Sequence, residues 1–256
     1  MSGEIIGLPQ TDAMTRVRYS LGAIAFALLF WQGLVWITGV PSFILPSPLR
    51  VAQAAHDNRG LLAEHATITA IEVIIGLFIG AVLGIVTAMQ LASSVQLHRL
   101  VMPLLIFSQA VPVFALAPIL TLWFGYGIAS KILMAVLIIY FPVTLSFYDG
   151  LTRVPAEILD MAKTMNGTDR QIMHHIKFRH ALPSLGTGLK LAAVYAPIGA
   201  VIGEWVGASK GLGYLMLLAN GRAKTDLMFA SLFTLAIMTL VLHLAATKVS
   251  NWLGDT

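Results

Sequence analysis

Residues 157–183 have the sequence EILDMAKTMNGTDRQIMHHIKFRHALP, a polar segment in the middle of a chain that is otherwise strongly apolar. The segment holds seven charged residues and three histidines in 27 positions. By contrast, Lys131 is the only charged residue between positions 101 and 148, and positions 227–247 contain none. Because charged groups are costly in lipid, this contrast predicts apolar membrane spans with one polar loop between them.

The first half of this segment has the features of a short helix with one apolar face. Pro155 suits the first helical turn, and Glu157 places a negative charge near the N-terminus of that helix. Four apolar residues then occupy the i, i+3, i+4 and i+7 positions of a single stripe: Ile158, Met161, Ala162 and Met165. A solvated connector is the alternative, but a connector would not need such a stripe.

The second half predicts a turn followed by another helix. Asn166-Gly167 is a turn signal, and residues 168–171 (TDRQ) have the spacing of a capping box, in which Thr and Gln side chains bond free backbone N–H groups. The second helix carries the apolar residues Ile172, Met173 and Ile176. It is expected to end before Pro183, because proline disfavours the α conformation of the residue before it. Residues 153–183, called the elbow below, are therefore expected to form a helix-turn-helix between two spans.

The composition is that of a membrane protein. Of 256 residues, 57% are hydrophobic and 11% charged, and the mean hydropathy is +0.83, whereas soluble domains carry about 25% charged residues. The net charge of +4, without a basic run, does not indicate nucleic-acid binding. The absence of cysteine excludes disulfides, thiolate metal sites and a cysteine nucleophile. The length suits one bundle, so we expect a cytoplasmic N-terminal segment (1–18) and a single transmembrane domain (19–256).

Six segments are long and apolar enough to cross a bilayer, which takes roughly 20 residues of helix. They are 19–37, 68–91, 100–124, 132–147, 185–206 and 228–248. The third contains Pro103, Pro112 and Pro118 and is expected to be kinked or broken. The fourth is short and is expected to begin at Ala129. The sequence thus predicts an all-α membrane protein with about six transmembrane helices.

The distribution of lysine and arginine predicts the orientation. With the N-terminus inside, nine of these residues fall on the cytoplasmic side, six fall outside and Lys190 lies within a span. Cytoplasmic loops carry an excess of Lys and Arg, so the count favours a cytoplasmic N-terminus and a cytoplasmic elbow. Residues 207–213 (GASKGLG) are then expected outside.

Polar groups inside spans are costly and tend to line a pathway or to bond one another. The candidates for a substrate path are Ser108, Gln109, Tyr140, Tyr195 and Glu204, with an interhelix hydrogen bond as the alternative for each. Tyr195 is the deeper of the last two and is expected to contact a planar, uncharged ring. Glu204 is expected at an outer gate or against a binding protein. Glu72 and His243 are expected near span ends, at the membrane interface.

Three other features have structural explanations. Gly76, Gly80 and Gly84 form a doubled G-x-x-x-G pattern, which allows close helix packing. The elbow histidines could suggest a metal site, but neighbouring helical residues point about 100° apart and no carboxylate completes a set. The elbow acids lie on an exposed loop without an apolar pocket to change their pKa values. We therefore expect neither a catalytic residue nor a metal site.

The elbow resembles the cytoplasmic EAA loop of bacterial ABC importer permeases, whose pattern is E-A-A, three residues, Gly, nine residues, Ile, one residue and Leu-Pro. Asp160, Ala162 and Ile176 keep this spacing, and Ala-Leu-Pro follows at 181–183. The departures from the pattern are Asp160 for Glu, Met161 for Ala, Asn166 for a Gly that stands next to it as Gly167, and Phe178-Arg179 for the first Leu-Pro.

The resemblance continues beyond the elbow. It includes LPSPLRVAQA (45–54), LWFGYGIASKI (122–132), YFPV (140–143) and VIGEWVGASKGLGYLM (201–216). These segments resemble the nitrate, sulfonate and taurine branch of the permeases. Residues 195–216 and 224–232 are most similar to permeases for the hydroxymethylpyrimidine precursor of thiamine.

The resemblance implies a type I permease fold in the bacterial plasma (inner) membrane and a role as the transmembrane subunit of an ABC importer. Its partners would be a second copy of the chain, a cytoplasmic ATPase pair that binds ATP and Mg²⁺, a periplasmic or extracellular solute-binding protein, and membrane lipid. The chain itself would bind no cofactor, and residues 207–213 lack the order of a phosphate loop. The elbow would be the coupling helix, with Glu157, Ile158, Asp160, Met161, Ala162, Met165, Asn166, Gly167 and Ile176 at the ATPase.

Other function classes stay as alternatives. An ATP-independent secondary transporter would have an internal repeat and ion-coupling residues, but the first, third, fourth and sixth spans have almost no charged residues. A membrane enzyme would have clustered acids, bases or metal ligands, and the elbow is the only cluster. The resemblance implies a thiamine-precursor pyrimidine or a sulfonate- or nitrate-like solute as the substrate, and the sequence does not decide between them, because specificity in such importers resides largely in the binding protein.

Overall fold

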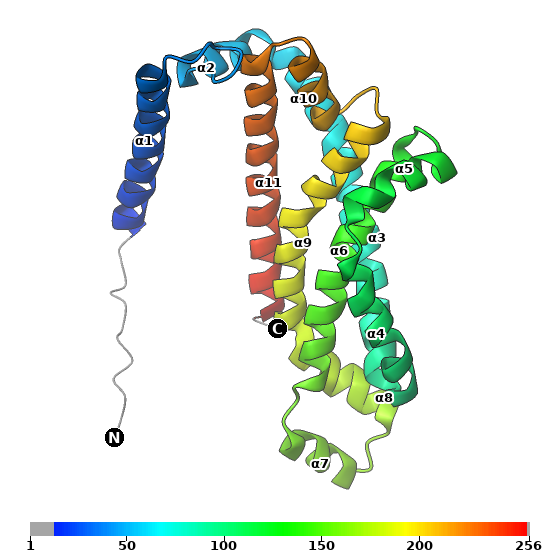
Figure 1. Ribbon diagram of the computed structural model, residues 1–256. Helices are drawn as coiled ribbons and strands as arrows, with labels where there is room; N and C mark the ends of the chain where they lie inside the picture. The colour runs from blue at the N-terminus through cyan, green and yellow to red at the C-terminus, as the bar shows by residue number, and fades with distance from the viewer. Residues whose placement is uncertain (1–12, 255–256) are drawn as a thin grey trace.

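The computed structural model describes residues 13–254, and every regular element in that range is helical (Figure 1). The expected segment 1–18 falls largely on residues 1–12, which lie outside the described residues. The elements are α1 (Ala13–Thr38), α2 (Pro48–Asp57), α3 (Arg59–Ser93), α4 (Val95–Ala110), α5 (Val113–Phe124), α6 (Ile128–Thr152), α7 (Ala156–Thr164), α8 (Asp169–Ile172), the π-helical turn η1 (Met173–Lys177), α9 (Phe178–Gly207), α10 (Leu212–Gly221) and α11 (Thr225–Gly254).

Five helical stretches of the described chain are long and apolar enough to cross a membrane: four single helices (α1, α3, α6 and α11) and the continuous stretch Asp169–Gly207. The pair α4 and α5 would make a sixth span, but its two helices meet at 98°. The predicted all-α membrane fold is therefore confirmed, with the third predicted span divided into two helices. The fourth predicted span is longer than expected, since α6 begins at Ile128 and ends at Thr152.

The division between α4 and α5 occurs at Pro112. Val111 and Pro112 both have extended backbone, with φ/ψ of −82°/119° and −60°/113°. Proline has no N–H group for the helix, and its ring disfavours the α conformation of the preceding residue, so α4 ends at Ala110. The other two prolines of this segment, Pro103 and Pro118, lie inside α4 and α5. Of the three prolines, only Pro112 interrupts the helix.

The core of the bundle is formed by α3, α6 and α9, with α11 packed against α9. The G-x-x-x-G face of α3 lies against α6. A Cβ atom added at Gly76, Gly80 or Gly84 would lie 2.7, 2.5 or 2.9 Å from side-chain atoms of Ala135, Ile139 and Val143, respectively. A larger side chain would therefore force the two helices apart, which explains why this face of α3 has only glycine at these positions.

The prediction that the second elbow helix ends before Pro183 was wrong. The chain is helical from Asp169 to Gly207, and Pro183 lies inside α9. Tertiary packing explains the difference, because Ala181 is fully buried and lies so close to Gly150 of α6 that a Cβ on that glycine would be 2.9 Å from it. This packing keeps the residues before Pro183 helical in spite of the local preference.

The two ends of the bundle have different elements (Figure 1). One end carries α2, α10 and the turn between α9 and α10, and the opposite end carries α7 and α8. Helix α10 was not predicted, and it lies between the fifth and sixth expected spans, 185–206 and 228–248. Helix α1 stands apart from the core, and Trp31 of α1 stacks on Phe229 and Phe233 of α11, with ring centroids 5.7 Å apart in each pair.

Candidate coupling elbow and translocation path

The turn of the elbow is built by hydrogen bonds that the sequence specifies. Asn166 has a positive φ of 57°, which an Asn tolerates, and the Gly167 N–H donates to the Ala162 carbonyl at 2.9 Å. The predicted capping box is confirmed: the Thr168 N–H donates to Gln171 Oε1 at 2.9 Å, and the Gln171 N–H donates to Thr168 Oγ1 at 3.3 Å. Helix α7 and the long helix beginning at Asp169 are thus joined by a defined turn rather than a flexible loop.

The apolar stripe of α7 is divided between the outside and the inside of the elbow. Ile158, Met161 and Met165 are 38%, 60% and 76% exposed. Ala162 is only 7% exposed, and its carbonyl accepts the Gly167 N–H of the elbow turn. The remaining candidates for ATPase contact are exposed at Glu157, Asp160 and Asn166 and half-buried at Gly167 and Ile176. Three large apolar side chains are therefore displayed together at the end of the molecule.

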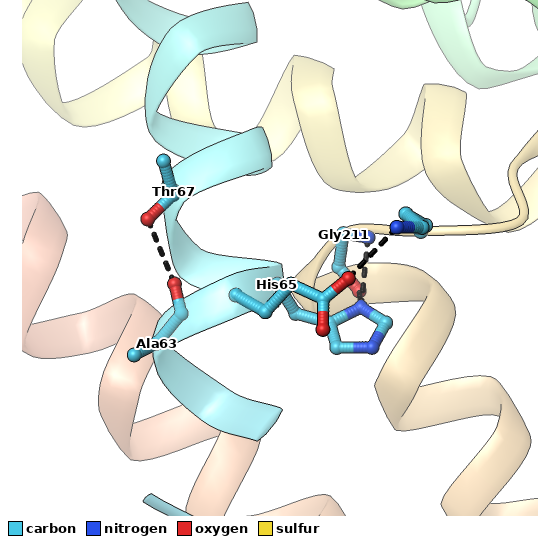
Figure 2. Close-up of polar contacts among 6 residues, drawn as sticks. Ala63, His65, Thr67 and Gly211 are labelled. Atoms are coloured by element: carbon cyan, nitrogen blue, oxygen red, sulfur yellow. Dashed lines mark hydrogen bonds and ion pairs between the residues drawn. The ribbon is translucent and has the colours of Figure 1, made fainter. Parts of the chain in front are cut away.

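A second polar site lies at the opposite end and joins α3 to the turn between α9 and α10. It consists of His65, Thr69 and Glu72 of α3, Glu204 of α9 and the backbone of residues 211–213, and is called the outer cluster below. The Gly211 N–H donates to His65 Nδ1 at 3.0 Å, and Figure 2 shows this histidine facing the turn. The Leu212 N–H donates to Thr69 Oγ1 at 2.8 Å. The start of α10 is thus fixed to α3.

Glu204 lies at the centre of the outer cluster. Thr69 Oγ1 donates to Oε1 of Glu204 at 2.6 Å, and the Gly213 N–H donates to its Oε2 at 2.5 Å. Glu204 is 1% exposed. A placement at an open outer gate or on the surface was therefore wrong for Glu204 in this conformation, because the turn before α10 covers its carboxyl group.

Glycine is required where this turn covers Glu204. Gly211 has φ 113° and ψ 162°, a conformation that is essentially restricted to glycine. A Cβ on Gly211 would overlap the carboxyl group of Glu204. The exposed edge of the turn carries an ion pair, with Lys210 Nζ 2.8 Å from Glu64 Oε1, and this carboxylate raises the pKa of Lys210.

Two further charged residues are buried near Glu204. Glu72 is 2% exposed and faces the Glu204 carboxyl group, so its expected position at the membrane interface was wrong. Its Oε2 has no hydrogen-bond partner within residues 13–254. Lys131 of α6 is 5% exposed and donates from Nζ to the carbonyls of Tyr126 and Gly127, at 3.1 and 2.9 Å. No local sequence pattern indicates that Glu72, Lys131 and Glu204 lie near one another, although each is a rare charged residue in an apolar stretch.

The other path candidates are scattered. Ser108 and Gln109 are exposed at the end of α4, where the Ser108 hydroxyl donates to the Leu105 carbonyl at 2.7 Å. Tyr140 donates to Thr87 Oγ1 at 3.0 Å and so links α6 to α3. Tyr195 is 40% exposed on α9. The structure of one chain therefore does not gather these four side chains into a single site.

A cavity of about 570 Å³ lies beside the outer cluster, with three aromatic side chains in its wall. These are Tyr126 before α6, Trp205 of α9 and Tyr214 of α10, and the rest of the lining is Glu204 with small or apolar residues. Neither lysine nor arginine is among the described residues that line it. This site, called the aromatic cavity below, can stack a flat ring but offers no cation for an anion.

Within residues 13–254, no group of three or more His, Asp or Glu side chains could hold a metal ion. The turn before α10 covers the carboxyl group of Glu204, and Glu72 is buried beside it. The arrangement is that of a membrane bundle with a displayed elbow at one end and a rigid, closed turn at the other.

Comparison with known proteins identifies the family. Residues 80–254 match the model for "Binding-protein-dependent transport system inner membrane component". A "Probable ABC transporter permease protein" of Haemophilus influenzae is 46% identical over 86% of this chain and 90% of its own length. The fold is similar to that of a chain in the inward-facing MetNI methionine ABC transporter, with a TM-score of 0.68 at 19% identity over 77% of this chain and 98% of that chain.

Two other relatives have names that include a substrate. The formylaminopyrimidine transport permease ThiX of Halalkalibacterium halodurans is 36% identical over 88% of this chain and 90% of its own length. The riboflavin transport permease RibX of Chloroflexus aurantiacus is 36% identical over 93% of this chain and 94% of its own length. Sulfonate and taurine permeases match more distantly, so the predicted branch is confirmed. The chain belongs to the binding-protein-dependent inner membrane components, the non-catalytic, multi-pass permease subunits of ABC importers.

Proposed function

We propose that this permease carries a small, planar, uncharged nitrogen heterocycle, of the class of the thiamine-precursor pyrimidines. The aromatic cavity is the observation that carries this proposal. Its three aromatic side chains can stack a flat ring, and stacking of a base on an aromatic side chain contributes about 1–3 kcal/mol. Its lining includes Glu204 and, within the described residues, neither lysine nor arginine.

This lining favours one of the two substrate classes left by the sequence. A sulfonate or nitrate needs a cation or several N–H donors where it binds, and neither lysine nor arginine is among the described lining residues. An uncharged pyrimidine needs a stacking surface and a few polar atoms. The names of ThiX and RibX, whose substrates are a pyrimidine and a flavin, support the second class.

The partners follow from family membership and from the surfaces of the chain. The displayed stripe of α7 is suited to insert into a groove of an ABC ATPase, and a soluble binding protein would deliver substrate at the opposite end. Helix α4 has no buried residue in the single chain, and Leu122 and Trp123 of α5 are 82% and 71% exposed. A second copy of the chain would cover part of this apolar surface, and lipid the rest. In this arrangement the N-terminus and the elbow are cytoplasmic.

The test is uptake by cells that express the permease with its cognate ATPase and binding protein. Radiolabelled hydroxymethylpyrimidine and taurine are the probes. We expect uptake of the pyrimidine and not of taurine. We also expect a loss of about tenfold with Trp205→Ala or Tyr126→Ala, since a stacking contribution of about 1–3 kcal/mol includes the roughly 1.4 kcal/mol that corresponds to a factor of ten.

Trp36→Ala is the matched control, because Trp36 of α1 is an exposed aromatic side chain, at 77%, that does not line the aromatic cavity. Uptake of taurine without the pyrimidine would refute the substrate class. An equal loss in the Trp36 variant would show that the aromatic cavity is not the relevant surface.

A further inference from the structure

A cavity of about 510 Å³ lies between the elbow and the end of α3. Part of its wall is apolar and includes Met89 and Ala92 of α3, Leu159 of α7 and Ile172 of α8. Helix α3 ends at Ser93, which also lines the cavity. The cavity is therefore at the level where an apolar membrane span ends and polar chain begins.

The other part of the wall is cationic. Lys163 of α7, Arg170 of α8 and Lys177 of η1 line it together with His174, and Asp169 is the one acid among the lining residues. Within residues 13–254, none of the three cations forms an ion pair with a carboxylate. Three cations against one acid give a positive potential that the residues described by the structure do not neutralise.

This cationic wall is not the face of α7 that displays its apolar stripe. At 100° per residue, Lys163 points about 160° away from both Met161 and Met165. A partner that covers the exposed methionines would therefore leave the Lys163 side of α7 facing α3. One side of α7 is therefore apolar, and the opposite side carries the cation Lys163.

We propose that this cavity binds the phosphodiester headgroup of an anionic phospholipid. The phosphate lies among Lys163, Arg170 and Lys177, and the start of an acyl chain lies against Met89 and Ala92. Basic pockets between helices at a membrane face bind such headgroups, because the cations attract the phosphate while the apolar wall accepts the lipid chain. A lipid at this position contacts both α3 and the elbow, so it stabilises the elbow against the bundle.

The test uses the purified full-length chain in a neutral detergent and measures lipid binding by native mass spectrometry. Phosphatidylglycerol is the probe, and phosphatidylcholine with the same acyl chains is the zwitterionic comparison. We expect saturable binding of phosphatidylglycerol that is at least about tenfold tighter than that of phosphatidylcholine. We expect Lys163→Gln and Arg170→Gln each to weaken the binding of phosphatidylglycerol about fivefold, because the attraction of one Lys or Arg to anionic lipid corresponds to about that factor in affinity.

Arg179→Gln is the matched control, because Arg179 is an exposed cation two residues beyond Lys177 that does not line the cavity. Equal binding of the two lipids, or an equal loss in the Arg179 variant, would overturn the proposal. Displacement of the lipid by millimolar inorganic phosphate would instead indicate a site for a free anion. Release of the lipid when the cognate ATPase is added would assign the cavity to the interface between permease and ATPase. Either displacement by phosphate or release by the ATPase would overturn the proposal of a lipid site.

Discussion

The outer cluster and the elbow lie at opposite ends of the same bundle. The side chains of the outer cluster are buried and hydrogen-bonded, whereas those of the elbow stripe are exposed and apolar. In the outer cluster, buried polar groups bond one another across long sequence separations, as in the Thr69–Glu204 hydrogen bond of 2.6 Å. In the elbow, large apolar side chains such as Met165, at 76% exposure, are left uncovered by residues 13–254. Breaking a buried polar contact destabilises the fold, whereas an exposed apolar group is available to a partner.

The polar groups of the outer cluster are bonded within the chain, whereas the elbow presents an apolar surface to a partner. The turn before α10 is held by three backbone N–H groups, those of Gly211, Leu212 and Gly213. The elbow turn is equally well bonded, but its outward face is apolar. The variants below probe this difference and are arranged by their expected effect on the free energy of unfolding of the permease alone.

The largest effect is expected from Gly211→Ala. The added Cβ would overlap the Glu204 carboxyl group, and the backbone there is in a region that alanine disfavours. Since backbone strain of this kind costs about 1–3 kcal/mol and overpacking costs about as much, we expect the free energy of unfolding to fall by about 3 kcal/mol. Chemical denaturation of the purified chain in detergent measures it.

Gly221→Ala is the control for the previous variant, because nothing lies within 4 Å of a Cβ at that glycine. We expect it to change the free energy of unfolding by no more than about 0.5 kcal/mol. Equal stability of the two variants would mean that the turn before α10 is not tightly packed on Glu204.

A smaller loss is expected from Glu204→Leu. The substitution leaves the Gly213 N–H without its acceptor and the Thr69 hydroxyl with only the His65 carbonyl, at 3.2 Å. A buried unsatisfied group costs about 1–3 kcal/mol. We expect a loss of about 2 kcal/mol, and about half of that for Glu204→Gln, whose amide oxygen retains one acceptor. Thermal unfolding of both variants beside the wild type decides this. An unaltered melting temperature in Glu204→Leu would remove the outer cluster as a stabilising site.

Almost no loss of stability is expected from Met161→Asp or Met165→Asp in the elbow, because both side chains are exposed. Surface substitutions usually change stability by no more than about 0.5 kcal/mol. Uptake by the complete importer should nevertheless fall by about tenfold or more, since a charge on the displayed stripe would have to be desolvated in the ATPase groove. Measurement of uptake and of ATPase binding on the same preparations separates docking from folding.

Met165→Leu, which keeps the apolar surface, is the conservative control and should transport normally. Ala162 is a poor probe of coupling because it is buried under the elbow turn. Normal uptake in both aspartate variants would show that the stripe does not mediate coupling.

The last two variants are cysteine substitutions that test on which side of the membrane each end of the bundle lies. They are expected to have the smallest effect on stability. The chain has no cysteine, so Lys163→Cys and Lys210→Cys each introduce a single thiol on an exposed side chain. With a membrane-impermeant thiol reagent on intact cells, we expect labelling at position 210 and none at position 163. The reverse pattern would invert the proposed orientation.

Local patterns in the sequence were sufficient for the features that depend on neighbouring residues. The capping box at 168–171 was predicted because its two side chains bond groups three residues away. The break at Pro112 was predicted because proline acts on its own peptide group and on the residue before it. The apolar spans follow from hydropathy alone, since a helix in lipid satisfies its own backbone and must present apolar side chains.

By itself, then, the sequence determined the all-α membrane fold, the elbow turn and the permease family, because each depends on local pattern or on motif similarity. Tertiary structure decided the rest. The Thr69–Glu204 contact joins residues 135 positions apart, and no local pattern indicates which buried carboxyl meets which helix. Packing against Gly150 kept α9 helical through Pro183, against the local preference. The burial of Ala162 beside Gly167 of the elbow turn likewise separated it from the other members of its stripe, because helical periodicity defines a face but not what lies against it.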